Sequence, residues 1–217
     1  MMDRHQAALA HVLWLGGSPC SGKSSIARLL ADRYGLRTYS CDEAFGRHRE
    51  KLTAERQPTL YKWTHTPWAD LWMQPAGVLL AEAIAAYREH LDLVVADLRR
   101  LPPSEPVLAE GTCLLPDGVQ PVLPSPAAGI WLVPTEVFQR GHYPRRGAWV
   151  QEIVNQCPDP QQALQNWMDR DVAFAAWVAD RVQALDLELL VVDGGRSVAE
   201  TAEVVARHFG LSGRPQP

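Results

Sequence analysis

The stretch GGSPCSGKSS, Gly16–Ser25, constrains the fold more than any other part of this chain. It follows a short apolar run near 11–16 that is typical of a β-strand, and it precedes apolar residues spaced as in a helix. Residues 17–24 fit the pattern G-x-x-x-x-G-K-[ST]. Glycines let the backbone wrap closely around a phosphate chain, and the positive end of the following helix would face that anion. We therefore predict a phosphate-binding loop between a strand and a helix.

Within this loop each residue type has a chemical role. Lys23 would reach the β- and γ-phosphates of a nucleoside triphosphate, and the Ser24 hydroxyl would bind Mg²⁺. The alternative is a glycine-rich turn that binds nothing. The residues predicted to bind the nucleotide here are Gly17, Ser18, Pro19, Cys20, Ser21, Gly22, Lys23, Ser24 and Ser25.

Composition excludes several other classes of function. The 217 residues carry a net charge of −4, which gives no broad basic surface for nucleic acid. No apolar run is long enough to span a membrane, and the N-terminal one is too short for the core of a signal peptide. The four cysteines are widely spaced, which favours free thiols over disulfides. We expect a soluble, cytoplasmic protein that binds neither nucleic acid nor a membrane; its oligomeric state stays open.

Strand-like and helix-like segments alternate along the whole chain. A long helix is predicted after Pro75, another after the capping sequence that begins at Asp159, and a last one after Ser197 with Glu200. The proline-rich segment 115–129 is interpreted as a surface connection. Strands that are near-continuous apolar runs favour an α/β fold with a parallel sheet covered by helices on both faces. The strands are expected near 11–16, 36–40, 106–111, 128–134 and 187–192.

Three segments place an acidic residue after an apolar run, as a strand beside the phosphate loop would. The run that ends at Asp97 has helical spacing, and the one that ends at Asp193 lies too near the C-terminus. Segment 106–111 is best placed beside the first strand, with Glu110 at its carboxyl end. Glu110 is therefore a candidate to hold a Mg²⁺-bound water or a substrate hydroxyl; a solvated strand-end carboxylate is the alternative.

With this loop and this order of elements, the sequence resembles the small P-loop kinases, the superfamily with the nucleoside monophosphate kinase fold. Shikimate and gluconate kinases, chloramphenicol phosphotransferase and the zeta-toxin kinases belong to it. The resemblance spans most of the chain in element order but is specific only at the phosphate loop. It implies a three-layer P-loop NTPase fold with strand order 2-3-1-4-5, a lid, and one kinase domain over 1–217. It also implies ATP and Mg²⁺.

The resemblance supplies a candidate general base. In chloramphenicol phosphotransferase and the zeta-toxin kinases, an aspartate just after the second strand accepts the proton of the substrate hydroxyl. Here YSCDEAF places Asp42 at that point, at the carboxyl end of a strand, where parallel sheets bind ligands. The alternative role for Asp42 is an N-cap of the following helix.

The family also has an arginine-rich lid after the fourth strand, which here would cover roughly 139–150. Arginine suits this role because its planar fork gives two directed hydrogen bonds to phosphate oxygens. The alternative is a solvated basic loop. Arg170 and Arg181, on the next helix, are weaker candidates that surface ion pairs would explain equally well. The resemblance assigns catalysis to Arg145 and Arg146 and nucleotide binding to Arg140.

Two further regions complete the predicted site. The turn VDGGRS, 192–197, matches the place where these kinases hold adenine, so Gly195 and Arg196 are assigned to the nucleotide, with a plain turn as the alternative. Segment 52–76 would cover the acceptor pocket, where Trp63 and Trp68 would form aromatic walls, unless they are core packing.

The predicted activity is an ATP- and Mg²⁺-dependent transfer of the γ-phosphoryl group to a hydroxyl of a small molecule. Such a molecule would be an antibiotic, a nucleoside-like metabolite or a cofactor precursor. The signature D-G-[FY]-P-R of nucleotide acceptors is replaced here by EGTCLLP, which favours a small alcohol. The alternatives are a nucleoside monophosphate kinase and a non-catalytic, nucleotide-binding regulatory protein.

Overall fold

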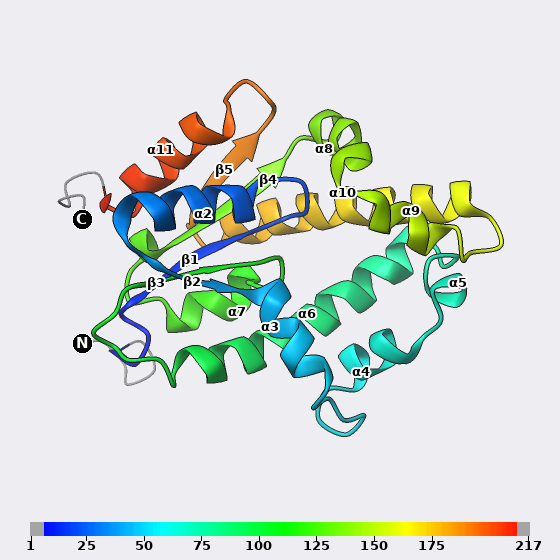
Figure 1. Ribbon diagram of the computed structural model, residues 1–217, viewed down its shortest axis with the longest axis horizontal. Helices are drawn as coiled ribbons and strands as arrows, with labels where there is room; N and C mark the ends of the chain where they lie inside the picture. Colours follow the sequence, from blue (N-terminus) through cyan, green and yellow to red (C-terminus); the bar gives the residue numbers. More distant parts are fainter. Residues whose placement is uncertain (1–6, 212–217) are drawn as a thin grey trace.

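A five-stranded parallel sheet forms the centre of the computed structural model, which describes residues 7–211 (Figure 1). Its strand order is β2-β3-β1-β4-β5, and every neighbouring pair is parallel. The predicted α/β class, the number of strands and their order are thereby confirmed. The strands are Val12–Gly17 (β1), Arg37–Ser40 (β2), Val107–Glu110 (β3), Gly129–Pro134 (β4) and Glu188–Val192 (β5).

Helices cover both faces of this sheet, because successive strand residues point to opposite sides and both sides are apolar. Trp14 and Trp131 pack into one buried cluster, and their neighbours Leu15 and Leu132 pack into the other. One face is covered by α2 (Lys23–Tyr34) and α11 (Val198–His208), and the other by α6 (Ala76–Leu98) and α10 (Pro160–Ala184). Within the described range, no helix is both long and apolar enough to cross a membrane.

The local signals for helix ends are confirmed. α2 ends at Gly35, which has a left-handed φ of 62°. The Asp159 side chain accepts a 3.0 Å hydrogen bond from the backbone N–H of Gln162. Ser197 and Glu200 form a reciprocal capping box at the start of α11. These ends depend on residues adjacent in sequence, which is why the pattern alone predicted them.

Shorter helices fill the connections between the strands and the long helices. Segment 52–76 contains two of them, and segment 139–150 falls on three others. Their bounds are Cys41–Arg49 (α3), Pro58–His65 (α4), Trp68–Leu71 (α5), Pro116–Val119 (α7), Gln120–Val122 (η1), Pro126–Ala128 (η2), Glu136–His142 (α8), Tyr143–Arg145 (η3) and Ala148–Val154 (α9).

The interpretation of 115–129 as a surface connection was wrong. Its short helices α7, η1 and η2 bury their apolar side chains in the same cluster as α6 and α10. The indole N–H of Trp131 donates a 2.7 Å hydrogen bond to the carbonyl of Leu114, which ties the start of this segment to β4. The prolines break regular structure, but the apolar residues between them still lose contact with water. Those buried are Leu115, Pro116, Val119, Val122, Leu123 and Ala128.

Candidate functional site

The loop between β1 and α2 has the backbone shape of an anion-binding concavity. Cys20 and Gly22 adopt positive φ values of 66° and 81°, and turns that alternate in this way direct successive N–H groups to one side. Gly22 is also the N-cap of α2, with no side chain capping it. The first N–H groups of the helix therefore have no side-chain acceptor, at the wall of a cavity of about 420 Å³. This geometry fits a phosphate chain.

Lys23 lies buried across this loop. Its Nζ donates hydrogen bonds to the carbonyl of Ser18, at 2.7 Å, and to the hydroxyl of Ser21, at 3.3 Å. Burial lowers the pKa of the Lys23 ammonium, and the carboxylates of Glu110 and Asp42 partly oppose this effect. A buried ammonium held by neutral acceptors would gain from an anion in the adjoining cavity.

Ser24 and Glu110 meet at the floor of the same cavity. The Ser24 hydroxyl donates a 3.1 Å hydrogen bond to Oε2 of Glu110, which ends β3 beside β1. One hydroxyl and one carboxylate are oxygen ligands of the kind Mg²⁺ prefers when phosphates and waters complete its shell. The described residues contain no cluster of three or more His, Cys, Asp or Glu side chains able to hold a metal by themselves. The pair fits Mg²⁺ brought in with a nucleotide.

Asp42 lies in the first turn of α3, exposed to solvent, and its side chain lines two adjoining cavities. The N-cap of this helix is Ser40, so the alternative role of Asp42 as the cap was wrong. The Asp42 side chain therefore stands where the cavity beside the β1–α2 loop adjoins a second, larger cavity. Lining both cavities with it are Pro19, Thr112 and Arg146.

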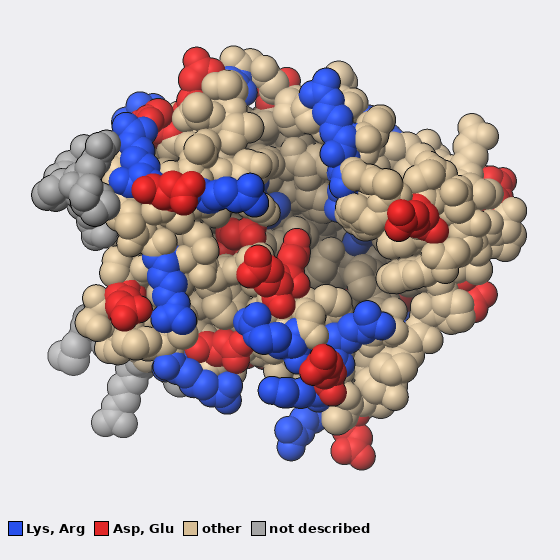
Figure 2. All heavy atoms as spheres, in the orientation of Figure 1, with Lys and Arg blue, Asp and Glu red and all other residues tan. Residues whose placement is uncertain are grey.

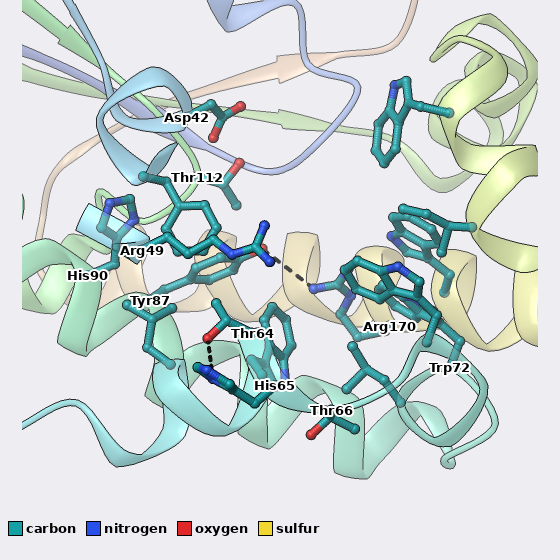
Figure 3. Close-up of a pocket in the computed structure, with 18 of the residues that line it drawn as sticks. Asp42, Arg49, Thr64, His65, Thr66, Trp72, Tyr87, His90, Thr112 and Arg170 are labelled. Atoms are coloured by element: carbon teal, nitrogen blue, oxygen red, sulfur yellow. Dashed lines mark hydrogen bonds between the residues drawn. The ribbon is translucent and has the colours of Figure 1, made fainter. Parts of the chain in front are cut away.

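The second cavity measures about 600 Å³ and has aromatic walls. Figure 3 shows Asp42 and Thr112 on one side of it and Arg170 with Trp72 on another. The two predicted wall residues line it: Trp63 is half-buried and Trp68 is 38% exposed. Trp72, from the same predicted segment, lines it as well. Four other large aromatic side chains in the wall were not predicted, because they come from helices far apart in sequence. These are Phe45, Tyr87, Trp149 and Trp167.

The two arginines predicted to act in catalysis from the lid differ in their position relative to the cavities. Arg146 lines both cavities and donates hydrogen bonds to the hydroxyl of Tyr143, at 3.1 Å, and to Oδ2 of Asp171, at 3.2 Å. Arg145 is exposed, and its Nη1 lies 3.4 Å from Nε2 of His142, outside both linings. The structure thus brings only one of these two arginines to the cavities.

Arg140 also lies outside both cavity linings. It forms ion pairs with Glu136, at 2.8 Å, and with Asp169, at 2.6 Å. Burial acts to lower the pKa of Arg146, but the carboxylate of Asp171 together with Tyr143 and Cys20 raises it overall. Arg146 therefore remains a cation at the boundary between the two cavities.

Arg170 corrects the expectation of a surface pair. It is 4% exposed, lines the larger cavity, and forms an ion pair between its Nε and Oδ1 of Asp171 at 2.9 Å. Asp171 is also buried and accepts a hydrogen bond from the Tyr143 hydroxyl. Sequence patterns gave no sign of this cluster, since an RD dipeptide on a helix is usually solvated.

Gln139 is another site residue that the sequence did not indicate. It is fully buried, and its Nε2 donates hydrogen bonds to the Ser18 hydroxyl, at 3.2 Å, and to the carbonyl of Pro19, at 3.0 Å. These contacts join α8 to the phosphate loop across the sheet edge. Neither the spacing nor the composition of 136–142 signals such a contact.

The loop predicted to hold adenine is exposed and lines neither cavity. The backbone N–H of Gly195 donates a 2.8 Å hydrogen bond to Oδ1 of Asp193, and Arg196 points from the same exposed turn. Gly194 has a φ of 91° and lies against the Phe138 ring of α8. The assignments of Gly195 and Arg196 stay predictions.

The opening of the site is visible on one face of the molecule. Figure 2 shows this face hollowed near its middle, with acidic and basic side chains gathered around the hollow. The four cysteines are free thiols, as expected.

The sequence matches no protein-family model, and no curated protein sequence matches it.

Proposed function

We propose that this protein is a small P-loop kinase that transfers the γ-phosphoryl group of ATP to a hydroxyl of a small molecule. The observation that carries the proposal is the junction of the two cavities. A concavity suited to phosphates opens beside an aromatic cavity suited to an organic acceptor, and Asp42 and Arg146 line both. This is where the donor and the acceptor of a phosphoryl group would have to meet.

The residues of the phosphate cavity would bind and orient the donor. Lys23 and the free N–H groups at the start of α2 would hold the phosphate chain. When bound, Mg²⁺ would neutralise charge that develops on the phosphates. Ser24 would bind the cation, and Glu110 would orient it directly or through a water.

Asp42 would position the acceptor hydroxyl and take its proton. The hydroxyl oxygen would form the new bond to the γ-phosphorus, the bond from that phosphorus to the β–γ bridging oxygen would break, and ADP would leave. Arg146 would lie against the transferring group. The segment 139–150 would act as the lid, with Arg140 and Arg145 reaching the nucleotide only if it moves.

The test uses Asp42→Asn, with Glu43→Gln as the matched control because Glu43 lies next to it on α3 and lines neither cavity. A metabolite library is screened for stimulated ADP release, and the product is identified by mass. Asp42→Asn should lower turnover by about 10²–10⁴-fold, the usual contribution of a general base. Glu43→Gln should keep wild-type turnover.

Nucleotide binding is measured separately, by the rise in melting temperature with MgATP. Both variants should keep the wild-type rise, and Lys23→Met should lose it. Unchanged turnover in Asp42→Asn would reject the role of that residue. A rise in melting temperature without turnover on any acceptor would favour the non-catalytic regulatory protein. If MgATP leaves the melting temperature unchanged, the phosphate-loop assignment itself is wrong.

A further inference from the structure

The larger cavity contains a buried cation that the phosphoryl transfer does not use. Arg170 projects from α10 into its wall and is 4% exposed, but it does not line the phosphate cavity. Its guanidinium carbon lies 5.2 Å from the ring centre of Trp72 and 5.7 Å from that of Trp63. The guanidinium thus lies against two aromatic rings and away from water, which strengthens its interaction with an anion.

The charges around Arg170 do not balance. Among the described residues, Asp171 is the one carboxylate that pairs with Arg170, and the same carboxylate pairs with Arg146. Two guanidinium groups thus share a single negative charge. Oδ2 of Asp171 already accepts hydrogen bonds from the Tyr143 hydroxyl and from Nη1 of Arg146. Asp42 also lines this cavity, but it forms no ion pair with either arginine, so one guanidinium charge is left without a carboxylate of its own.

The hydrogen-bonding groups of Arg170 are also not well satisfied. Its Nη1 lies 3.5 Å from the hydroxyl of Tyr87, at the long limit of a hydrogen bond. A guanidinium carries five N–H donors in a planar fork that matches a carboxylate or a phosphate. Figure 3 shows the guanidinium of Arg170 directed toward the cavity, across from Asp42.

We infer that the acceptor alcohol carries an anionic group, a carboxylate or a phosphate, on a flat apolar frame. The anion would pair with Arg170, the frame would pack among the tryptophans, and the hydroxyl would lie toward Asp42. This inference rests on the proposed kinase function, because it takes the ligand of this cavity to be the phosphoryl acceptor. The recognition of an anionic aromatic molecule by the cavity does not require turnover.

The experiment measures binding without nucleotide, so that its outcome is separate from that of the kinase assay. The probes are benzyl alcohol, 4-(hydroxymethyl)benzoate and 4-(hydroxymethyl)phenyl phosphate, which share a ring and a hydroxyl and differ in charge. Binding is followed by quenching of tryptophan fluorescence, because Trp63, Trp68 and Trp72 line the cavity. At least one anionic probe should bind about tenfold more tightly than benzyl alcohol, as expected for one hydrogen-bonded ion pair.

Variants locate the source of that preference. Arg170→Met should abolish it, so that all three probes bind with similar affinity. Arg181→Met is the matched control, since Arg181 lies on the same helix, is exposed and lines neither cavity; it should keep the wild-type preference. The stronger of the two anionic probes distinguishes a carboxylate acceptor from a phosphorylated one.

Two results would overturn the inference: equal affinity of wild-type protein for neutral and anionic probes, including no measurable binding of any, or an unchanged preference in Arg170→Met. Far-UV circular dichroism shows whether Arg170→Met is folded. If it is not, Arg170→Lys replaces it; it keeps the charge but loses the fork, and should reduce the preference without removing it.

Discussion

At Gly17 the chain passes so close to β4 that a side chain does not fit. A Cβ at this position would lie 2.0 Å from the carbonyl oxygen of Leu132, and the φ of 126° is one that other residues rarely adopt. We expect Gly17→Ala to lower the free energy of unfolding by about 3 kcal/mol or more, from overpacking and backbone strain together. Urea denaturation followed by circular dichroism measures it.

Gly46 provides the matched control for this substitution. It lies within α3, and a Cβ there would meet nothing within 4 Å. Gly46→Ala should therefore stabilise the protein by about 0.5–1 kcal/mol, through the lower entropy of the unfolded chain. Similar effects of the two substitutions would mean that the contact between β1 and β4 at Gly17 is not as close as described.

A buried histidine beside the sheet makes stability depend on pH. Nε2 of His48 lies 2.9 Å from Oδ2 of Asp97, which also accepts the Tyr39 hydroxyl at 3.0 Å. Burial lowers the pKa of His48 below its usual 6.5, although the carboxylate of Asp97 partly opposes this. Between the lowered pKa and 6.5, the unfolded chain binds a proton that the folded chain does not. Acidification through this interval should therefore destabilise the protein.

The free energy of unfolding should fall as the pH drops below about 6.5, by up to about 1.4 kcal/mol per pH unit for each such histidine. His48→Gln should make the decline shallower, and His11, whose pKa burial also lowers, should leave a residual slope. His65→Gln, at an exposed position, is the control and should keep the wild-type slope. A slope unchanged by His48→Gln would contradict this account.

At the scale of elements, two ion pairs connect α10 to segment 139–150, and one of them is buried while the other is partly exposed. Asp171 is buried and binds Arg146 and Tyr143, whereas Asp169 is partly exposed and pairs with Arg140. Asp171→Asn leaves two guanidinium groups without their carboxylate, so we expect a loss of about 3 kcal/mol or more in unfolding free energy. Hydrogen exchange over 143–154 should become faster.

Asp169→Asn is the matched control on the same helix. An exposed pair contributes at most about 1 kcal/mol, so this variant should stay close to wild type in denaturation and in exchange. Equal losses in the two variants would show that burial does not distinguish the pairs. A smaller loss in Asp171→Asn than in Asp169→Asn would reverse the assignment of the stronger tether.

Over the whole molecule, the segments expected as a cap and a lid are not independent. Trp72 from the first and Tyr143 and Val150 from the second pack into one apolar cluster with Trp167 of α10. Part of this cluster lines the larger, aromatic cavity, which also borders the loop between β1 and α2. The walls of this cavity therefore depend on packing between three parts of the chain that are far apart in the sequence. A movement of segment 139–150 would therefore alter both cavities, because Arg146 lines the two of them.

The sequence by itself determined the five strands, the long helices, several helix ends and the glycine-rich turn between β1 and α2. These features depend on residues within a few positions of one another, such as Ser197 with Glu200 or Gly22 with Lys23, so a local pattern contains the physical cause. The parallel sheet also followed, because the strands at its centre are near-continuous apolar runs. The sequence singled out Asp42 and Glu110 because both stand where a strand ends, and both line the cavity beside the β1–α2 loop.

Only the tertiary structure decided which side chains share the two cavities. Arg146 and Arg170 meet at Asp171, and both line a cavity with Asp42, because the fold packs the segment around Arg146 against the middle of α10. Arg170 and Asp171 look like an ordinary exposed dipeptide in the sequence, but in the fold they are buried and form a charge cluster. The same packing placed Arg140 and Arg145 outside the cavities, although all three lid arginines look alike in the sequence.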